Sequence, residues 1–263
     1  MILPEIDPVA FQLGFLSIRW YSLTWLLAFG LIYLLALKNL NKISSNQLSD
    51  LMFYGLLGAM LGGRLGYMFF YSLDQLLSNP IKLFYIWEGG LSFHGGLIGV
   101  LFSSYLLSIR WHIRFLELMD FIAPYVPIGL GSVRVGNFLN SELLGRPTEV
   151  QWGVIFPSDP LGLVRHPSQL YQAFGEGVVL LIFMLWFIRR PRPHMATSSV
   201  FLIGYGVIRC FTEIFREPDS HIGFDLFNFI SRGQLLSFPM IVLGVVLLFY
   251  SYKKHSKKDE AIS

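Results

Sequence analysis

Cysteine and charge are both scarce in this sequence. Cys210 is the only cysteine among 263 residues, and Asp, Glu, Lys and Arg together make up 14% of the chain. A single cysteine excludes an internal disulfide bond. The net charge of +3 is small, and we expect no nucleic acid among the partners of this protein.

The sequence also lacks the marks of a cleaved leader and of metal or nucleotide chemistry. Residues 1–8 contain two acids, two prolines and no basic residue, so we expect the mature protein to keep them. The six histidines are scattered, with no His-x-x-x-His or Cys-x-x-Cys spacing and no phosphate-binding P-loop. We therefore expect neither a metal nor a cofactor.

Hydrophobic residues are what the sequence has in excess. They make up 54% of the chain, and the mean hydropathy is +0.55, as is typical of a polytopic membrane protein. A membrane-spanning helix needs about 20 apolar residues. Seven stretches approach this length: 17–37, 49–70, 91–109, 117–136, 172–189, 198–216 and 234–252. The sequence predicts an all-α integral membrane protein with seven transmembrane helices, in a single domain over 1–263 with a compact loop at about 137–171.

Basic residues predict the orientation of these spans. Lysines and arginines follow the first, third, fifth and seventh spans: Lys38, Lys42, Arg110, Arg114, Arg189, Arg190, Arg192, Lys253, Lys254, Lys257 and Lys258. The opposite side carries acids: Glu5, Asp7, Asp74, Glu88, Glu142, Glu149, Asp159, Glu217, Asp219 and Asp225. Because basic residues mark the cytoplasmic side, we expect an external N-terminus, an external loop 137–171 and a cytoplasmic C-terminus.

Ionisable residues inside the sixth span form one stripe. Tyr205, Arg209 and Glu213 are spaced by four residues, and Arg216 follows three later, so they share a helical face. A charge inside the membrane is costly and marks a functional site by default. The alternative is an Arg209–Glu213 pair that neutralises itself within the helix, which would leave Arg216 without an assigned acid.

The fourth span places an arginine and two asparagines at its external end and Asp120 at its other end. Arg134, Asn137 and either Asn140 or Ser141 share a face if the helix continues, whereas a break at Gly136 would free backbone N–H groups near Arg134. Either arrangement suits an anion, because guanidinium matches phosphate oxygens bidentately. Packing by small residues with polar contacts is the alternative, and it explains the arginine poorly.

Two further spans carry polar groups near glycine. His94 is flanked by glycines at the start of the third span, and a lone histidine is equally consistent with a structural role. Arg64 lies inside Gly62–Gly66, a small-xxx-small pattern typical of close helix packing, so this arginine could be functional or could pair with Glu213 or another carboxylate.

Intramembrane cations outnumber acids in this reading. Arg64, Arg134 and Arg209 stand against Glu213, with Glu176 as a second candidate acid. A net positive cavity in the external leaflet favours an anion such as a phospholipid headgroup. From these residues alone, an anion or lipid transporter and a non-catalytic lipid-binding scaffold remain alternatives to an enzyme.

Several motifs together carry a family resemblance. They are Arg19-Trp20-Tyr21, Ser92 to Gly96, Arg134 to Gly145, Arg165 to Tyr171, Tyr205 to Asp219 and Gly233 to Ser237. Over almost its whole length the chain resembles the bacterial phosphatidylglycerol–prolipoprotein diacylglyceryl transferases. The resemblance implies transfer of a diacylglyceryl group from phosphatidylglycerol to the lipobox cysteine of a preprolipoprotein signal peptide at the bacterial inner membrane, with release of glycerol phosphate.

The resemblance also implies which residues act. Its essential positions fall on His94, Arg134 and Arg209, and the other positions that the family needs fall on Tyr21, Asn137, Glu142, Gly145, Tyr205, Glu213 and Arg216. The sequence departs from the family pattern at Gln172, where glutamate is expected, and at Ser141, where glycine is common. As a hypothesis, His94 takes the thiol proton while Arg134 and Arg209 stabilise the leaving phosphate.

Overall fold

The computed structural model describes residues 1–14, 16–40, 42–85, 87, 89–218 and 230–260. The predicted external acids Glu88, Asp219 and Asp225 lie outside the described residues. The chain divides into two compact units. The first unit comprises Met1–Ile32 and Met119–Ser263, and the second unit comprises Tyr33–Leu118.

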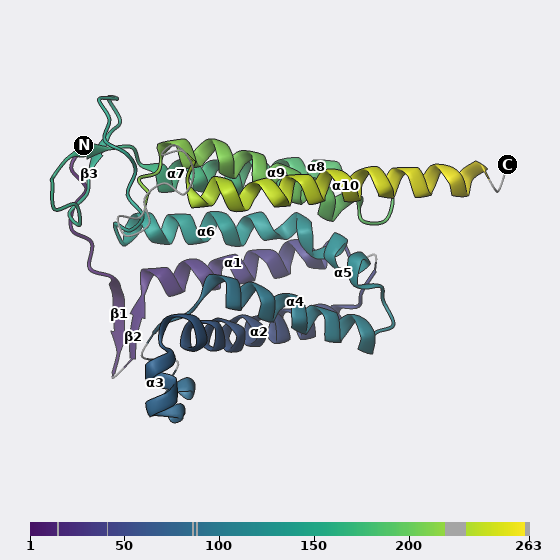
Figure 1. The fold of residues 1–263 in the computed structure, drawn as a ribbon, viewed down its shortest axis with the longest axis horizontal. Coiled ribbons are helices and arrows are strands. Elements are labelled where there is room, and N and C mark those ends of the chain that lie inside the picture. The colour runs from purple at the N-terminus through teal and green to yellow at the C-terminus, as the bar shows by residue number, and fades with distance from the viewer. Residues whose placement is uncertain (15, 41, 86, 88, 219–229, 261–263) are drawn as a thin grey trace. The chain divides into compact units, whose positions relative to one another are not determined.

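Helices make up most of the first unit. Its helical elements are α1 (Trp20–Leu37, which ends in the second unit), α5 (Phe115–Ile122, which begins in the second unit), η3 (Ala123–Tyr125), α6 (Val126–Leu139), α7 (Ser168–Gln172), η4 (Ala173–Val179), α8 (Leu180–Phe187), α9 (Ala196–Thr212), η5 (Glu213–Phe215) and α10 (Arg232–Glu260). The element η4 is a π-helix between α7 and α8. Helices α9 and α10 pack along each other, and η4 packs on α6 (Figure 1). These contacts bring the predicted fourth, fifth, sixth and seventh spans together.

Five helical segments are long and apolar enough to cross a membrane. They are Trp20–Leu37, Phe115–Leu139, Ser168–Phe187, Ala196–Phe215 and Arg232–Ser256. The other two predicted spans coincide with α2 (Ser45–Tyr71) and α4 (Phe93–Arg110), which are richer in glycine and polar residues. The protein is therefore a mostly helical membrane protein with five candidate spans among the described residues. The count of seven and the orientation of the termini stay predictions.

Glycines hold α2 against α4 in the second unit, which also contains α3 (Leu73–Ser78) and η1 (Pro80–Phe84). A Cβ atom on Gly58 would lie 2.5 Å from the carbonyl oxygen of Gly99, and one on Gly66 would lie 2.9 Å from the Cα of Gly95. Gly62 meets the backbone of Gly95 in the same way. The helix packing predicted from the Gly62–Gly66 spacing is confirmed.

Arg64 is buried among backbone carbonyls of the segment that precedes α4. Its side chain is 4% exposed and donates to the backbone carbonyls of Leu83 at 3.2 Å, Lys82 at 2.5 Å and Gly89 at 2.5 Å. Carbonyl dipoles satisfy the guanidinium hydrogen bonds, as a buried charge requires. Arg64 therefore binds the backbone of the segment that precedes α4, and its suggested pairing with a carboxylate stays a prediction because Glu88 lies outside the described residues.

Two short β-hairpins lie at the polar end of the first unit. β1 (Val9–Leu13) pairs with β2 (Leu16–Arg19), and β3 (Val154–Ile155) pairs with β4 (Val164–Arg165), both antiparallel. The N-terminal residues join the second hairpin, where the Leu3 amide donates to the Ile155 carbonyl at 3.0 Å. Residues 140–167 contain no helix, because α6 runs to Leu139 and α7 begins at Ser168.

Asp120 has a capping role that its position in an apolar span did not reveal. One carboxylate oxygen accepts from the Met195 amide at 2.7 Å, and the other accepts from the Ser198 amide at 2.8 Å and the Ser198 hydroxyl at 2.7 Å. The first N–H groups of a helix have no partner within it and carry partial positive charge. Asp120 therefore caps α9 from another helix and fixes α9 relative to α5.

Candidate functional site

Arg134 and Arg209 converge on one buried carboxylate, that of Glu176. Glu176 is fully buried. One of its oxygens accepts from Nη1 of Arg209 at 3.2 Å, and the other accepts from Nε and Nη2 of Arg134, both at 3.4 Å. The two arginines come from α6 and α9, which are far apart in the sequence. The structure thus gathers the two predicted cations at one point in the first unit.

The local backbone explains how Glu176 reaches these arginines. A Cβ atom on Gly177 would lie 2.7 Å from the Cα of Gly131, so η4 and α6 touch backbone to backbone there. Only glycines permit this approach. Glu176 precedes Gly177 in the π-helix η4, and such π segments occur frequently at functional sites. Of the two arrangements left open by the sequence, α6 continues through Gly136 rather than breaking there.

Glu213 forms the second carboxylate partner of Arg209. The distance from Nη2 of Arg209 to Oε2 of Glu213 is 2.6 Å, although that oxygen accepts no aligned hydrogen bond, so the contact is an ion pair. A Cβ atom on Gly233, in the first turn of α10, would lie 2.7 Å from the Glu213 carboxyl. The Arg209–Glu213 pair predicted within the sixth span is confirmed. Because Gly233 has no side chain, the Glu213 carboxylate can lie against the start of α10.

Polar side chains beside this cluster centre on Glu142. Its carboxylate accepts from Nδ2 of Asn137 at 3.0 Å and from Nδ2 of Asn140 at 3.3 Å, and its carbonyl accepts from Nε2 of Gln169 at 2.6 Å. Three buried atoms have no hydrogen-bond partner among the described residues: Oδ1 of Asn137, Oε1 of Gln169 and Nε2 of Gln172. Unpaired buried polar atoms are uncommon in native proteins, so a water molecule or a polar ligand would satisfy them.

Gly145 and Arg216 meet at the base of the loop. Their backbones form an antiparallel bridge, and the Gly145 carbonyl accepts from Nη1 of Arg165 at 3.0 Å. A Cβ atom on Gly145 would collide with the backbone of His166. Arg165 is held in turn by Asp159 at 2.8 Å, and hydrogen bonding to Arg165 lowers the pKa of the Asp159 carboxyl. This pair fixes the backbone around Gly145.

Aromatic residues surround His166 at the same end of the first unit. Nδ1 of His166 lies 3.2 Å from the Tyr171 hydroxyl, which also accepts from the indole N–H of Trp152 at 2.6 Å. The ring of Phe215 lies edge-on at 5.2 Å from that of His166. Burial lowers the pKa of His166, because an apolar environment disfavours the imidazolium. Burial therefore favours the neutral imidazole at this position.

The two predicted tyrosines take different positions in the first unit. Tyr21, in the first turn of α1, lies against α6, where a Cβ on Gly136 would be 2.6 Å from its ring. Tyr205 lies one turn before Arg209 on α9 and stacks on Phe201, with ring centroids 5.9 Å apart. Tyr21 thus reaches the helix that carries Arg134, and Tyr205 continues the stripe of Arg209 and Glu213.

His94 lies on α4 in the second unit. It is the second residue of that helix, its side chain is exposed, and its ring meets that of Phe93 edge-on at 5.6 Å. The described residues contain no group of three His, Cys, Asp or Glu side chains that could hold a metal.

The carboxylates of the site are harder to identify from the sequence than its arginines. Glu176 carried only secondary weight, although a glutamate in an apolar run between two glycines is a signal that could have promoted it. Arg134, Arg209, Glu176 and Glu213 carry two positive and two negative formal charges. The predicted excess of cations is therefore absent from this four-residue cluster. Each guanidinium has five N–H donors, so Arg134 can bind further oxygens beyond those of Glu176.

Known proteins match this chain over nearly its full length. The family described as prolipoprotein diacylglyceryl transferase matches residues 8–250. A phosphatidylglycerol–prolipoprotein diacylglyceryl transferase from Teredinibacter turnerae is 48% identical over 98% of this chain and 95% of its own length. One of the same name from Acinetobacter baylyi is 50% identical over 95% of this chain and 94% of its own length. With the buried arginine cluster in place, this chain belongs to the prolipoprotein diacylglyceryl transferase family.

Proposed function

We propose that this protein transfers the diacylglyceryl group of phosphatidylglycerol to a prolipoprotein, as the names of its relatives state for them, and that the acceptor is a cysteine thiol. The observation that carries the proposal is the convergence of Arg134 and Arg209, from separate helices, on one buried point. Two guanidinium groups held together in a water-poor site suit a lipid phosphate.

In the proposed reaction, the sulfur of the substrate cysteine attacks the glyceryl carbon that bears the phosphate ester. A carbon–sulfur bond forms, the carbon–oxygen bond breaks, and glycerol phosphate leaves with the bonding electrons. Negative charge grows on the phosphate as it leaves, and Arg134 and Arg209 stabilise it. The thiol proton passes to a base, for which His94 is the proposed group because histidine exchanges protons near neutral pH.

The remaining polar residues are proposed to orient the lipid headgroup. Asn137 and Tyr205 would contact the phosphate or the glycerol, while Glu142 and Glu213 hold their neighbours in place. Oε1 of Gln169 and Nε2 of Gln172, which lack a partner among the described residues, would provide one acceptor and one donor for headgroup hydroxyls. We further propose seven spans, with the N-terminus external, the C-terminus cytoplasmic and this site in the external half of the bacterial inner membrane.

Substitution of Arg134 tests the phosphate role. Lysine keeps a positive charge beside Glu176 but loses the planar fork, so we expect Arg134→Lys to stay folded and lose about 100- to 1000-fold in rate. The assay follows thioether formation on a lipobox peptide and release of glycerol phosphate. Exposed Arg190 provides the control as Arg190→Lys. A folded Arg134→Lys protein with near-normal turnover would refute the role.

The other functional readings predict different results in the same vesicles. A transporter would move lipid without thioether product, and a scaffold would bind lipid without turnover. For the base, His94→Gln should lower the rate and remove the acid limb of the pH–rate profile. An unchanged rate and pH–rate profile would show that His94 is not the base. The positive charges of Arg134 and Arg209 would then promote loss of the thiol proton.

A further inference from the structure

The two oxygens of the Glu176 carboxylate are held unequally. Oε1 accepts from Nη1 of Arg209 at 3.2 Å and lies 3.3 Å from the Thr212 hydroxyl, which also lies 3.3 Å from the Arg209 carbonyl. Oε2 accepts from Nε and Nη2 of Arg134, both at 3.4 Å. Hydrogen bonds between charged groups are typically about 2.7–2.9 Å long. The contact with Arg134 is therefore long, and it is the side of the carboxylate that is easier to release.

The two arginines differ in the same way. Arg209 lies between two carboxylates, with Nη1 at 3.2 Å from Glu176 and Nη2 at 2.6 Å from Glu213. Among the carboxylates of the described residues, Arg134 contacts Glu176 alone. The Arg134 side chain is 14% exposed, whereas the Glu176 side chain is not exposed at all. Arg134 is therefore the cation that an incoming anion can reach, and Arg209 is already neutralised on two sides.

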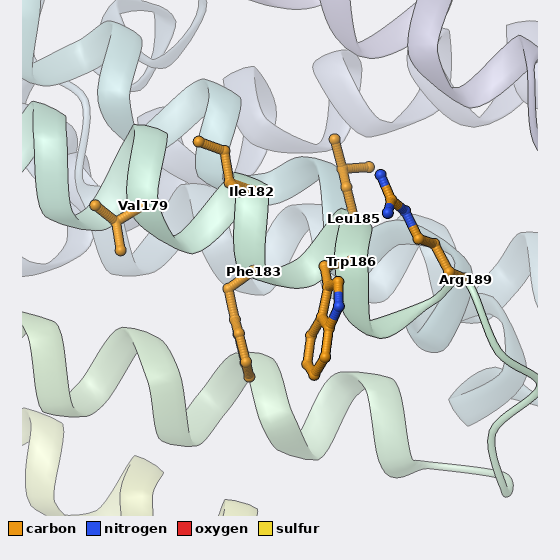
Figure 2. Close-up of a pocket in the computed structure, with 6 residues that line it drawn as sticks. All are labelled: Val179, Ile182, Phe183, Leu185, Trp186 and Arg189. Carbon is orange, nitrogen blue, oxygen red and sulfur yellow. The ribbon is translucent and has the colours of Figure 1, made fainter.

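The helical run that carries Glu176 offers Arg134 no second acid. Glu176 is the only Asp or Glu in residues 168–188. Figure 2 shows that the turns beyond it carry apolar side chains up to the next charged group: Val179, Ile182, Phe183, Leu185, Trp186 and Arg189. Once Oε2 leaves Arg134, an anion that binds there meets no competing carboxylate from this run.

We propose that Glu176 occupies, in the lipid-free enzyme, the place on Arg134 that the lipid phosphate takes. The phosphate binds the planar fork of Arg134 and displaces Oε2, while Arg209 and Thr212 keep Oε1. Glu176, Arg209 and Thr212 are thus positioning residues, and Arg134 is the group that touches the phosphate. The exchange keeps the buried guanidinium of Arg134 paired both before and after the lipid enters, as a buried charge requires. This inference rests on the proposed phosphate role of Arg134.

Phosphorus NMR titration of the full-length protein in detergent tests the exchange, with glycerol phosphate as the soluble probe. Glu176→Gln removes the competing carboxylate, so we expect it to bind the probe about fivefold more tightly, which corresponds to about 1 kcal/mol. Glu213→Gln is the matched control, because it removes an equally buried charge that contacts Arg209 rather than Arg134. Its gain in affinity should be clearly smaller, measured at a temperature where both variants are folded.

A second variant separates competition from net charge. Glu176→Asp keeps the charge but shortens the side chain by one methylene, which draws Oε2 away from Arg134 while Arg209 and Thr212 hold the other oxygen. We expect this variant to bind glycerol phosphate more tightly than the wild-type protein does. The exchange is overturned if Glu176→Asp shows no gain, or if Glu176→Gln and Glu213→Gln gain equally, because net charge alone would then account for the affinity.

Arg134→Lys shows whether the phosphate role itself fails. We expect this variant to bind the probe about tenfold more weakly, which corresponds to about 1.4 kcal/mol, near the lower end of the value of a hydrogen bond to a charged group. If its affinity equals that of the wild-type protein, both the phosphate role of Arg134 and the exchange are refuted. If its affinity falls while the Glu176 variants show no gain, the phosphate role stands and the exchange alone is refuted.

Discussion

Glu176 should control both the stability and the rate of this enzyme. Its carboxylate is fully buried, and it contacts Arg134 and Arg209 at 3.4 and 3.2 Å. In Glu176→Gln, the neutral amide leaves Arg134 without the carboxylate that it contacts, whereas Arg209 keeps Glu213 at 2.6 Å. Breaking a buried pair by removing one partner costs about 3–5 kcal/mol.

That cost can be measured as a change in melting temperature. For a chain of this size, about 2–4 °C of Tm accompany each kcal/mol, so Glu176→Gln should melt roughly 6–20 °C lower in detergent. Glu217→Gln removes a carboxylate that is 47% exposed and 3.4 Å from Arg165. A surface pair is worth about 0–1 kcal/mol, so this matched control should melt close to the wild-type protein.

The kinetic effect of Glu176→Gln has a defined direction. Removal of a negative charge strengthens ground-state binding of a lipid phosphate and loosens the alignment of the two arginines. We therefore expect KM for phosphatidylglycerol to fall or stay constant while kcat falls, measured by release of glycerol phosphate at a temperature where the variant is folded. A variant with wild-type Tm and kcat would show that Glu176 does not hold the arginines.

Three further predictions concern the parts that position the site. Asp120→Ala should lower Tm and loosen α9, because three donors lose their acceptor; Asp120→Asn, which keeps one acceptor oxygen, should have a smaller effect, and equal Tm values would contradict the cap. The lowered pKa of Asp159 means that its contribution to stability is complete above the ordinary carboxyl pKa of 3.8 and is lost as pH falls through the lower folded value; Asp159→Asn should remove this acid dependence from the unfolding curve. Gly99→Leu should separate α2 from α4 and lower Tm, because its Cβ would collide with the Gly58 backbone, whereas Gly30→Leu, in open space on α1, should be tolerated.

The sequence predicted the helices and the charged residues of the site, but not all of their partners. Apolar length and helical spacing are local properties, so the stripe of Arg209 and Glu213 could be read directly. The Arg134–Glu176 contact joins residues 42 positions apart and depends on the close approach of Gly131 and Gly177. No local sequence pattern encodes that approach, so the sequence does not reveal that Glu176 contacts both arginines.

Two other elements show the same limit. The hairpin β1–β2 is too short to be detected in a search for membrane-spanning stretches of about 20 residues, although many of its residues are apolar and β-forming. The sequence left Arg64 open between a functional role and a pairing with a carboxylate, because an intramembrane cation needs compensation. Among the described residues, the backbone carbonyls of Lys82, Leu83 and Gly89 accept from its guanidinium, and a sequence does not reveal where carbonyls point.

The glutamine at position 172 has a physical explanation in the charge balance of this site. Gln172 and Glu176 are four residues apart on one helical run, and both are fully buried. A carboxylate at 172 would add a negative charge four residues from Glu176, which Arg134 and Arg209 already contact. Burial makes an uncompensated charge expensive. We therefore expect the neutral amide at this position to leave the arginine pair intact.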